Sequence, residues 1–453
     1  MTIFWHRRDL RTHDNAGLYR ALRNETDVLP IFIFDKNILD RLENKADARV
    51  EFLQNEVSRL ANEYREAGGA MRVFYGKPLQ IWKKLLEEYP EIEAVYTNED
   101  YEQYAKDRDF KVAKLVEGRG GRFRAYKDHV IFAGDEIQKK AGGPYTVFTP
   151  YMRTWRAKLD ERISTMVNDE GKELKVSFYL KPYPNRKYFN ALAPTSKFGK
   201  KELVVPSLQD MGFEPGNIDI PPTEVSRELI KNYDETRDIP GIEGTSRLGI
   251  HYRHGTVSIR EKCLRAMKLN DTYVNELIWR DFYSQILQHF PHVENGPFRE
   301  KYDAIPWIND EDHFQAWCAG KTGVPIVDAG MRELNETGYM HNRVRMIVAS
   351  YLTKHLLTTW QWGEAYFAEK LLDFELASNN GGWQWAAGCG TDAQPYFRVF
   401  NPESQQKKFD PEFKYIKEWV PEYGTADYPE PLVEHKFGRE RAIATYKEAL
   451  NGN

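Results

Sequence analysis

The sequence predicts an α/β unit at the N-terminus, a long connecting segment and a mostly helical C-terminal half. Short β-rich apolar runs alternate with helical stretches up to about residue 130, as in the βαβ units of a Rossmann-like parallel sheet. Prolines interrupt the segment from about 170 to 223, which is typical of a linker. Beyond it, apolar residues recur at helical spacing. We therefore expect an α/β domain at 1–135, a linker at 136–223 and an all-α domain at 224–453.

Each expected element follows from a local pattern. The strands are expected at five apolar runs, namely Ile3–Trp5, Val28–Phe34, Met71–Tyr75, Ala94–Tyr96 and Arg122–Tyr126. Between the second and third runs, residues 48–68 place Val50, Leu53, Val57 and Leu60 at helical spacing before a Gly-Gly stop. In the second half, helices are expected over 273–290, 326–336, 341–357 and 363–376.

Composition indicates a soluble, cytoplasmic globular protein. Hydrophobic residues make up 41% and charged residues 29% of the chain. No run approaches the ~18 apolar residues of a membrane span, and residues 1–8 lack the order of a signal peptide. Cys263, Cys318 and Cys389 have neither disulfide nor metal-ligand spacing, so no metal site is expected. Because the net charge is -4, binding of nucleic acid would require a local basic patch.

The run Asn275–Tyr283 is predicted to be a helix with a chemically distinctive face. Glu276, Trp279, Arg280 and Tyr283 share that face. A carboxylate beside a Trp on a partly buried face has its ionised form disfavoured unless a cation compensates. That environment suits proton donation or hydrogen bonding to a ligand. The same pattern also fits an ordinary helix with a surface Glu–Arg pair and a core Trp.

A second predicted helix, Met340–Met346, could contact a base or another planar ring. Asn342 and Met346 lie at i and i+4, and Arg343 and Arg345 flank that stripe. An amide and a guanidinium can bond to the polar edge of such a ring, and Met supplies an adaptable apolar contact. A solvated basic helix face would show the same pattern.

Two glycine-containing segments could bind a large ligand. Residues 373–388 hold paired Asn and Gly and two Trp residues, which allow close backbone approach beside aromatic faces. Residues 244–249 offer hydroxyls and backbone donors for phosphates, without the spacing of a P-loop. A helix boundary with core tryptophans and a plain turn are the corresponding ordinary interpretations.

Taken together, these motifs resemble those of the DNA photolyase/cryptochrome family in order and spacing. The matching runs are Asn275–Tyr283, Lys321–Ala329, Met340–Met346 and Asn379–Phe400, and Trp5–Asn15 resembles the family's opening signature with His6 in place of an aromatic residue. The resemblance covers nearly the whole chain. It is closest to the class I cyclobutane pyrimidine dimer (deoxyribodipyrimidine) photolyases, because relatives acting on the six-four photoproduct carry a histidine pair where this chain has Asn342 and Met346.

The resemblance implies that the C-terminal half binds FAD in a folded-back shape. Arg345 would pair with Asp373 beside the flavin ring, and Asn379 would face flavin N5. Glu375 stands where close relatives often have Asp. The implied cofactor-binding set is Tyr233, Thr245, Ser246, Arg247, Leu248, Gly249, Tyr273, Arg280, Arg345, Asp373, Phe374, Glu375 and Asn379.

Family members usually hold a second, antenna chromophore in the N-terminal domain. Folate-binding relatives carry an Asn–Glu pair where this chain has Tyr104-Ala105. A folate contact is therefore in doubt, and a folate, a deazaflavin, another flavin or an empty site all remain open.

The resemblance further implies a light-dependent lyase acting on ultraviolet-damaged DNA. Excited reduced FAD would donate an electron to a flipped-out cyclobutane pyrimidine dimer, with Glu276 bonded to its carbonyl and Trp279 and Trp385 as aromatic walls. Asn342 and Met346 complete the implied catalytic set. Trp383, Trp360 and Trp307 match the family's electron path to oxidised flavin. The implied DNA contacts are Arg237, Glu276, Trp279, Asn342, Arg343, Arg398, Gln405, Lys407 and Lys408.

Two rival functions are weighed against repair. A cryptochrome-type blue-light photoreceptor would keep the flavin, but such proteins often carry a C-terminal extension and this chain ends about 50 residues after Asn401–Glu403. A more distant electron-transfer flavoprotein is disfavoured because no GxGxxG fingerprint follows a strand near the start. We expect a monomer with no obligate protein partner and no membrane partner.

Overall fold

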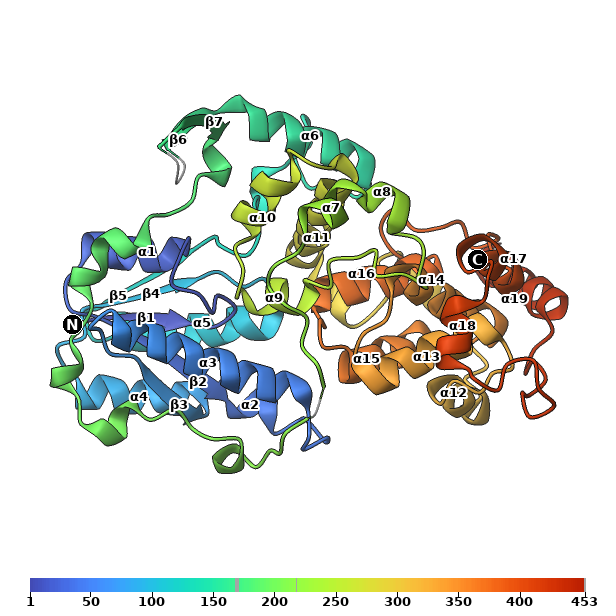
Figure 1. The fold of residues 1–453 in the computed structure, drawn as a ribbon, viewed down its shortest axis with the longest axis horizontal. Helices are drawn as coiled ribbons and strands as arrows, with labels where there is room; N and C mark the ends of the chain where they lie inside the picture. The colour runs from blue at the N-terminus through green and yellow to red at the C-terminus, as the bar shows by residue number, and fades with distance from the viewer. Residues whose placement is uncertain (168–170, 217, 452–453) are drawn as a thin grey trace. The chain divides into compact units, whose positions relative to one another are not determined.

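The computed structural model describes residues 1–167, 171–216 and 218–451, and the chain divides into two compact units. The α/β unit comprises Met1–Ile137, Thr154–Thr223 and Leu248–Lys268. The helical unit comprises Gln138–Arg153, Glu224–Arg247 and Leu269–Asn453. By its contacts, Leu248–Lys268 belongs to the α/β unit, although it follows the position expected for the domain boundary. The segments of each unit can be followed by colour along the chain in Figure 1.

A five-stranded, all-parallel sheet forms the centre of the α/β unit, as predicted. Its strands are β1 Thr2–His6, β2 Val28–Asp35, β3 Arg72–Gly76, β4 Ala94–Asn98 and β5 Arg122–Tyr126, in the order β3-β2-β1-β4-β5. The register pairs Thr2 with Val28 on one side and with Ala94 on the other. Because β1, β2 and β4 are buried along their whole length, they are apolar runs rather than alternating ones.

Helices cover both faces of this sheet. Phe4 of β1 packs into a core with residues of α1 (Ala16–Asn24) and α3 (Ala48–Glu66). Its neighbours Ile3 and Trp5 pack into the opposite core with residues of α4 (Pro78–Glu88) and α5 (Gln103–Glu117). This division follows from the alternation of side chains along a strand. Between β2 and α3 lies the one-turn helix α2 (Lys36–Leu39), and α3 confirms the helix expected over 48–68.

Part of the segment expected to be a linker has regular structure. The helix α6 (Phe148–Glu161) is followed by an antiparallel hairpin of β6 (Ile163–Val167) and β7 (Glu173–Ser177). The proline-rich remainder forms short 3₁₀ turns. Two helices, α9 (Gly249–His254) and α10 (Ile259–Ala266), complete the α/β unit. The 3₁₀ elements up to residue 211 are η1 Gly134–Glu136, η2 Phe178–Leu180, η3 Asn185–Ala191, η4 Thr195–Lys197, η5 Lys200–Leu203 and η6 Gln209–Met211.

In its described residues, the helical unit contains helices and turns but no strand. Its core draws buried residues from Tyr302 to Tyr446, among them Tyr351 and Leu352 of the π-helical turn η9 (Tyr351–His355). Its α-helices are α7 Arg227–Lys231, α8 Tyr233–Thr236, α11 Asp271–His289, α12 Glu311–Cys318, α13 Pro325–Thr337, α14 Asn342–Ser350, α15 Trp360–Lys370, α16 Leu376–Ala387, α17 Pro402–Phe409, α18 Lys414–Trp419 and α19 His435–Asn451, and its 3₁₀ turns are η7 Pro291–Glu294 and η8 Glu300–Ala304.

The helices expected over 273–290, 326–336, 341–357 and 363–376 are present as α11, α13, α14 with η9, and α15, but their ends differ from those predicted. The helix expected over 363–376 ends at Lys370, because Leu371 adopts an extended conformation, and α16 begins only at Leu376. The helix expected from residue 341 begins at Asn342, because His341 is its N-cap and accepts a hydrogen bond from the backbone of Arg343.

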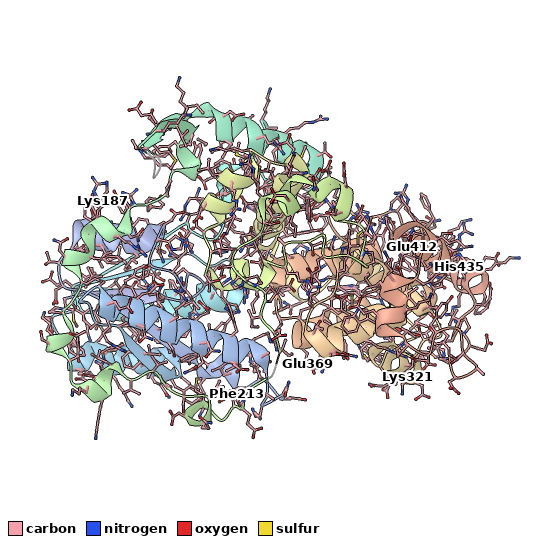
Figure 2. The ribbon with its side chains drawn as sticks, in the orientation of Figure 1. Lys187, Phe213, Lys321, Glu369, Glu412 and His435 are labelled. Atoms are coloured by element: carbon pink, nitrogen blue, oxygen red, sulfur yellow. The ribbon has the colours of Figure 1, made fainter. Side chains whose placement is uncertain are left out.

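Charged side chains cover the outside of each unit, as the exposed residues Lys187, Lys321 and Glu412 illustrate (Figure 2). Among the described helices, none is long and apolar enough to cross a membrane.

Candidate functional site

The predicted face of α11 is present, and an aromatic partner missed by the sequence analysis stacks on it. Asn270 caps the helix by accepting hydrogen bonds from the amides of residues 272 and 273. The ring of Trp279 lies parallel to that of Phe148, with centroids 3.7 Å apart and planes 3° apart. Its edge also contacts Phe282 at 5.6 Å. Phe148 lies between Tyr145 and Tyr151 in the segment expected to be a linker, and no local pattern there pairs it with Trp279.

Glu276 forms an ion pair that the sequence analysis did not predict. Its Oε1 accepts a hydrogen bond from Nη1 of Arg237 at 2.5 Å, and both side chains are partly buried. Burial raises the pKa of Glu276, while Arg237 lowers it; the net shift is upwards. Arg237, expected as a phosphate contact, is thus already paired with a carboxylate in the free protein.

On α14, the predicted stripe is accessible and its arginines have acidic partners. Asn342 is exposed and Met346 partly buried. Arg343 pairs with Asp238 at 2.8 Å. Arg345 pairs with Asp373 at 2.9 Å, as the resemblance implied, and its Nε donates to the Met340 carbonyl at 2.7 Å. These pairs fix both guanidinium groups beside the stripe.

Tyrosines hold the hydroxyl-bearing run 245–247 of the helical unit. The hydroxyls of Thr245 and Tyr339 are 3.0 Å apart, and the Tyr273 hydroxyl donates to Ser246 Oγ at 3.1 Å. The Arg247 guanidinium lies 4.7 Å from the centre of the Tyr339 ring. Tyr339 was missed by the sequence analysis, because it lies in the turn just before the motif that begins at residue 340. Tyr233, also in the implied set, contacts the Tyr273 ring edge-on at 5.0 Å.

A second buried pair joins α11 to the start of α16. Arg280 Nη2 lies 3.2 Å from Glu375 Oε1, and both side chains are at most 10% exposed. The other carboxylate oxygen of Glu375 accepts from the Ser378 hydroxyl at 3.2 Å. Phe374, next in the chain to Glu375, is partly buried against the core of the unit.

Asn379 and its neighbour both bond to Glu364, a residue that the sequence analysis did not identify. The Asn379 amide donates to the Glu364 carbonyl at 3.1 Å. The Asn380 amide donates to the Glu364 carboxyl at 2.9 Å. Burial raises the pKa of Glu364 to about 7. A polar group that can carry a proton at neutral pH therefore lies directly behind the two amides.

Of the tryptophans expected to conduct electrons, Trp383 and Trp360 are buried and Trp307 is partly buried. The backbone of Gly363, one turn after Trp360, lies directly against the Trp383 ring. The Trp383 ring also contacts Trp317 edge-on at 6.1 Å, and Trp317 was not identified from the sequence. Trp385, expected as an aromatic wall, is partly buried.

The expected basic rim lies at and before α17. Arg398, Lys407 and Lys408 are exposed and Gln405 is partly buried. Lys407 forms an i,i+4 ion pair with Glu403 at 2.5 Å. Lys408 lies 5.0 Å from the Phe409 ring.

In the α/β unit, the position expected to contact a folate is engaged in other bonds. The Tyr104 hydroxyl donates to Asp35 at 2.6 Å and accepts from Asn37 at 3.1 Å. Ala105 is buried.

Comparison with known proteins agrees with this architecture along the whole chain. The protein-family model described as DNA photolyase matches residues 2–168, and that described as FAD binding domain of DNA photolyase matches residues 273–448. A deoxyribodipyrimidine photo-lyase of a Synechococcus strain is 36% identical, over 98% of this chain and 96% of that protein.

Solved structures show the same fold. An archaeal photolyase from Sulfolobus tokodaii, crystallised with two FAD molecules, has a TM-score of 0.80 and 34% identity over 99% of each chain. A cryptochrome from Synechocystis has a TM-score of 0.82 and 25% identity over 98% of this chain and 99% of that one. An α/β unit combined with a helical, FAD-binding unit defines a flavoprotein whose cofactor is FAD. The chain belongs to the DNA photolyase/cryptochrome family.

The residues present fit FAD. Gly382 of α16 has open space within 4 Å of the position that a Cβ would take, and Gly381 lies against Tyr283 where a side chain would clash. A planar ligand can approach such a backbone closely. The same helical unit provides hydroxyls at 245 and 246, the exposed guanidinium of Arg247, and the paired charges of Arg345 and Arg280. Hydroxyl and guanidinium donors suit phosphates.

Proposed function

We propose that this protein repairs cyclobutane pyrimidine dimers in DNA in a light-dependent reaction. The observation that carries the proposal is the face of α11, where Glu276, whose pKa is raised, lies one turn from the large aromatic surface of Trp279. Such a face can stack on a pyrimidine dimer and hydrogen-bond its carbonyl. The 36% identity to a deoxyribodipyrimidine photo-lyase over almost the whole chain supports it.

Each residue proposed for the lesion site has a role that follows from its chemistry. FAD, when bound in its reduced form, supplies the electron that cleaves the dimer after light absorption. Trp279 and Trp385 hold the dimer by stacking, which is worth ~1 to 3 kcal/mol per base. Glu276 donates a hydrogen bond to the pyrimidine carbonyl and stabilises the charge that develops there. Asn342 and Met346 contact the dimer beside it. Photolyases belong to the enzymes that extrude the target base from the duplex.

The FAD contacts are proposed residue by residue. Tyr233, Thr245, Ser246, Arg247, Leu248, Gly249 and Tyr273 would hold the phosphates and ribityl chain. Arg345, Asp373 and Asn379 would lie along the flavin ring. Glu375 is held by Arg280 at 3.2 Å, so we propose that the pair acts as one unit on the ribose or adenine, together with Phe374.

DNA would be held by a local cationic rim. Arg398, Lys407 and Lys408 are exposed and would neutralise phosphates, with Gln405 as a neutral donor. Arg237 and Arg343 each have a carboxylate partner in the free protein. They would therefore contribute less net charge to the rim than exposed, unpaired cations do.

A cryptochrome-type photoreceptor is the second candidate. The similarity in fold to the Synechocystis cryptochrome, with a TM-score of 0.82, favours it as the alternative. One experiment separates the two functions. The purified protein is reduced, mixed with oligonucleotides carrying a cyclobutane dimer or a six-four photoproduct, and exposed to blue light. Restoration of the cyclobutane substrate alone is the expected result, and restoration of neither substrate would favour the photoreceptor.

A second chromophore is a separate question. The Tyr104 contacts with Asp35 and Asn37 occupy the groups at the expected folate position. We therefore propose that folate is not the antenna pigment. An absorption spectrum of the purified protein that contained a folate band besides that of the flavin would contradict this.

A further inference from the structure

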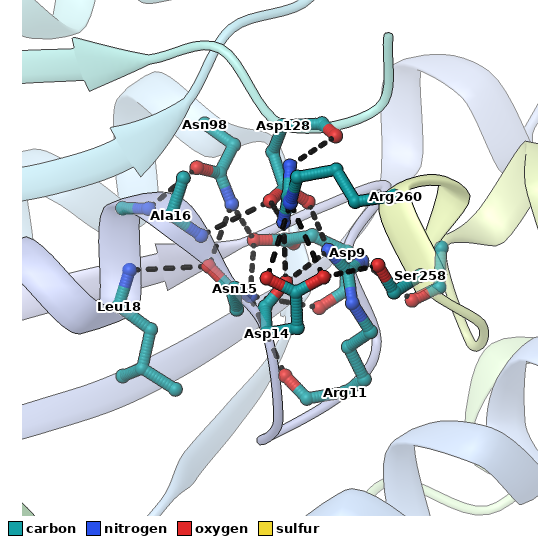
Figure 3. Close-up of polar contacts among 12 residues, drawn as sticks. Asp9, Arg11, Asp14, Asn15, Ala16, Leu18, Asn98, Asp128, Ser258 and Arg260 are labelled. Atoms are coloured by element: carbon teal, nitrogen blue, oxygen red, sulfur yellow. Dashed lines mark hydrogen bonds and ion pairs between the residues drawn. The ribbon is translucent and has the colours of Figure 1, made fainter. Parts of the chain in front are cut away.

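The opening motif of the chain, Trp5–Asn15, has no role in the proposed chemistry. Its side chains Asp9, Arg11, Asp14 and Asn15 are buried in a polar cluster at the carboxyl ends of β1, β4 and β5 (Figure 3). In open α/β sheets this edge, at the point where the strand order reverses, is where ligands usually bind. Here the order β3-β2-β1-β4-β5 places that point between β1 and β4. Residues of the segment Leu248–Lys268 bind there instead.

Arg260 of α10 is the centre of this cluster. Its Nε donates to Asp14 Oδ1 at 3.1 Å, its Nη2 to Asp128 Oδ1 at 2.9 Å and its Nη1 to the Asp128 carbonyl at 3.1 Å. Arg11 donates to the other oxygen of Asp128 at 2.6 Å, and Ser258 donates to Asp14. Burial raises the pKa of Asp128, but Arg11, Arg260 and the Ala16 amide lower it, and the net shift is downwards. Removing one partner of such buried pairs leaves an uncompensated charge, which is costly.

The same motif fixes the C-terminal end of α9. The Leu10 amide donates to the His254 carbonyl, and Arg11 Nη1 to the Gly255 carbonyl, both at 3.0 Å. Gly255 has a φ of +63°, and a Cβ there would lie 2.2 Å from the Arg8 carbonyl oxygen. The loop after β1 and the end of α9 are therefore in direct backbone contact, and only glycine fits at this position.

The segment directly before α9, residues 245–247, contains a strained backbone conformation. Arg247 directly precedes the cap of α9 and has a φ of +49°, in the left-handed region. A non-glycine residue stays there only when its surroundings over-determine it. On the N-terminal side, Thr245 and Ser246 are bonded to tyrosines. On the C-terminal side, Leu248 and Gly249 begin the short helix whose far end the opening motif holds.

We propose that the Asp14–Arg260–Asp128 cluster is a positioning device for FAD. By fixing α9 it keeps Arg247 in the conformation that presents residues 245–249 to the phosphates, so that the cluster sets FAD affinity although none of its own side chains contacts FAD. The inference rests on the proposed FAD contacts at 245–249. Asp14 and Arg260 are thus positioning residues, not catalytic ones.

Asp14→Asn in the full chain tests this. Asn keeps the shape of Asp and tolerates the positive φ of 42° at this position, but removes the charge that pairs with Arg260. The matched control is Asp47→Asn, a buried carboxylate that caps α3 and pairs with Arg49. Flavin is removed from each variant and titrated back, and the Kd is measured by flavin fluorescence. Hydrogen exchange is measured over residues 246–255.

The expected result is a Kd raised roughly tenfold in Asp14→Asn, with faster exchange over 246–255 and a less structured flavin absorption band. Asp47→Asn should keep the parent Kd. An unchanged Kd in Asp14→Asn despite faster exchange would overturn the proposal, and so would an equal rise in both variants, which indicates general destabilisation. If Asp14→Asn does not fold, Ser258→Ala removes a single donor to Asp14 and is judged by the same criteria.

Ser246→Ala and Thr245→Ala distinguish this proposal from the site on which it rests. If the Kd for FAD rises in these two variants but keeps the parent value in Asp14→Asn, the proposed FAD contacts are supported. Only the positioning role of the cluster is then contradicted. A parent Kd in both alanine variants would move the FAD phosphates away from 245–249, and the proposed site would then fail together with the inference.

Discussion

The carboxyl group of Glu276 has one cation beside it, Arg237, and an aromatic residue, Trp279, one helical turn away. Burial outweighs Arg237 and raises its pKa, so the protonated form that can donate to a carbonyl is more populated than in water. The sequence was sufficient to predict this face, because i, i+3 and i+4 spacing alone defines it. It could not predict Arg237 as the partner, since 39 residues separate the two in the chain.

We expect Glu276→Gln to repair dimers with nearly parental quantum yield and Glu276→Ala to repair with a reduced one. Gln retains a hydrogen-bond donor, whereas Ala leaves the pyrimidine carbonyl unpaired. Both variants should retain FAD and bind damaged DNA. Repair by the parent should fall as pH rises through the raised pKa of Glu276 and the donor is lost, while Glu276→Gln should lack that fall. Loss of flavin on purification of Glu276→Ala would assign the residue to the cofactor instead.

Trp279→Ala should weaken binding of a dimer-containing oligonucleotide by ~1 to 3 kcal/mol, the value of one base–aromatic stacking contact. Its parallel partner Phe148, 3.7 Å away, would remain as a smaller aromatic surface. The measurement is fluorescence anisotropy with damaged and undamaged oligonucleotides. Trp279→Phe, which keeps a ring, is the matched control and should lose less affinity. Parental affinity of Trp279→Ala for the damaged oligonucleotide would remove the residue from the lesion pocket.

Glu364 should make the protein less stable as pH rises from 4.5 to 7. Its pKa moves from 4.5 to about 7 on folding, so within that window the folded state binds more protons than the unfolded state. The free energy of unfolding then falls with pH, by about 3 kcal/mol in total. Glu364→Gln should abolish this contribution and raise Tm at pH 8 relative to the parent. Equal Tm differences at pH 4 and pH 8 would contradict the assignment.

At the scale of elements, the five strands and the long helices could be predicted because each carries a complete local pattern. β1 and β2 are continuous apolar runs, and α11 and α14 carry motifs at helical spacing. The break at residues 371–375 could not be predicted, because Leu371 and Leu372 continue the apolar pattern of α15 and both are buried. Tertiary burial, not a sequence signal, ends that helix.

The helix α17 should carry part of the salt dependence of DNA binding. Lys408→Ala should reduce the slope of log K against log salt by ~1, as loss of one phosphate contact does. Lys407→Ala should also reduce it by up to ~1, although its pairing with Glu403 offsets some of its charge. Glu403→Gln, which frees Lys407, is the control and should leave the slope unchanged or steepen it. Parental slopes in both lysine variants would place the DNA elsewhere.

At the scale of the whole molecule, the order of an α/β part and a helical part could be predicted, but the assignment of two segments could not. Leu248–Lys268 has the helical pattern of the second half, yet Arg260 and Ser258 bind residues near the start of the chain. The hairpin β6–β7 lies in a region rich in charged residues, where no apolar run indicated strands. Local hydrophobic periodicity does not predict long-range ion pairs, and it predicts short exposed strands poorly.

The electron supply and the repair chemistry should be separable at Trp383. Phenylalanine is harder to oxidise than Trp but similar in shape, and the Trp383 ring is buried against Gly363 and Phe367. Trp383→Phe should therefore fold and bind FAD normally, yet fail to convert oxidised to reduced flavin under blue light with an external thiol. Once the flavin is reduced chemically, the same variant should repair cyclobutane dimers almost as well as the parent, because the catalytic electron starts on the flavin and returns to it.

Trp360→Phe and Trp307→Phe should share the defect of Trp383→Phe in photoreduction, since they are the next members of the proposed path. Trp317→Phe is the matched control: its ring contacts Trp383 at 6.1 Å but lies outside the proposed path, so photoreduction should persist. Flavin absorbance during illumination measures each variant. Loss of photoreduction in Trp317→Phe with retention in Trp360→Phe would redirect the path through Trp317. Failed repair by Trp383→Phe after chemical reduction would instead place Trp383 in the substrate step.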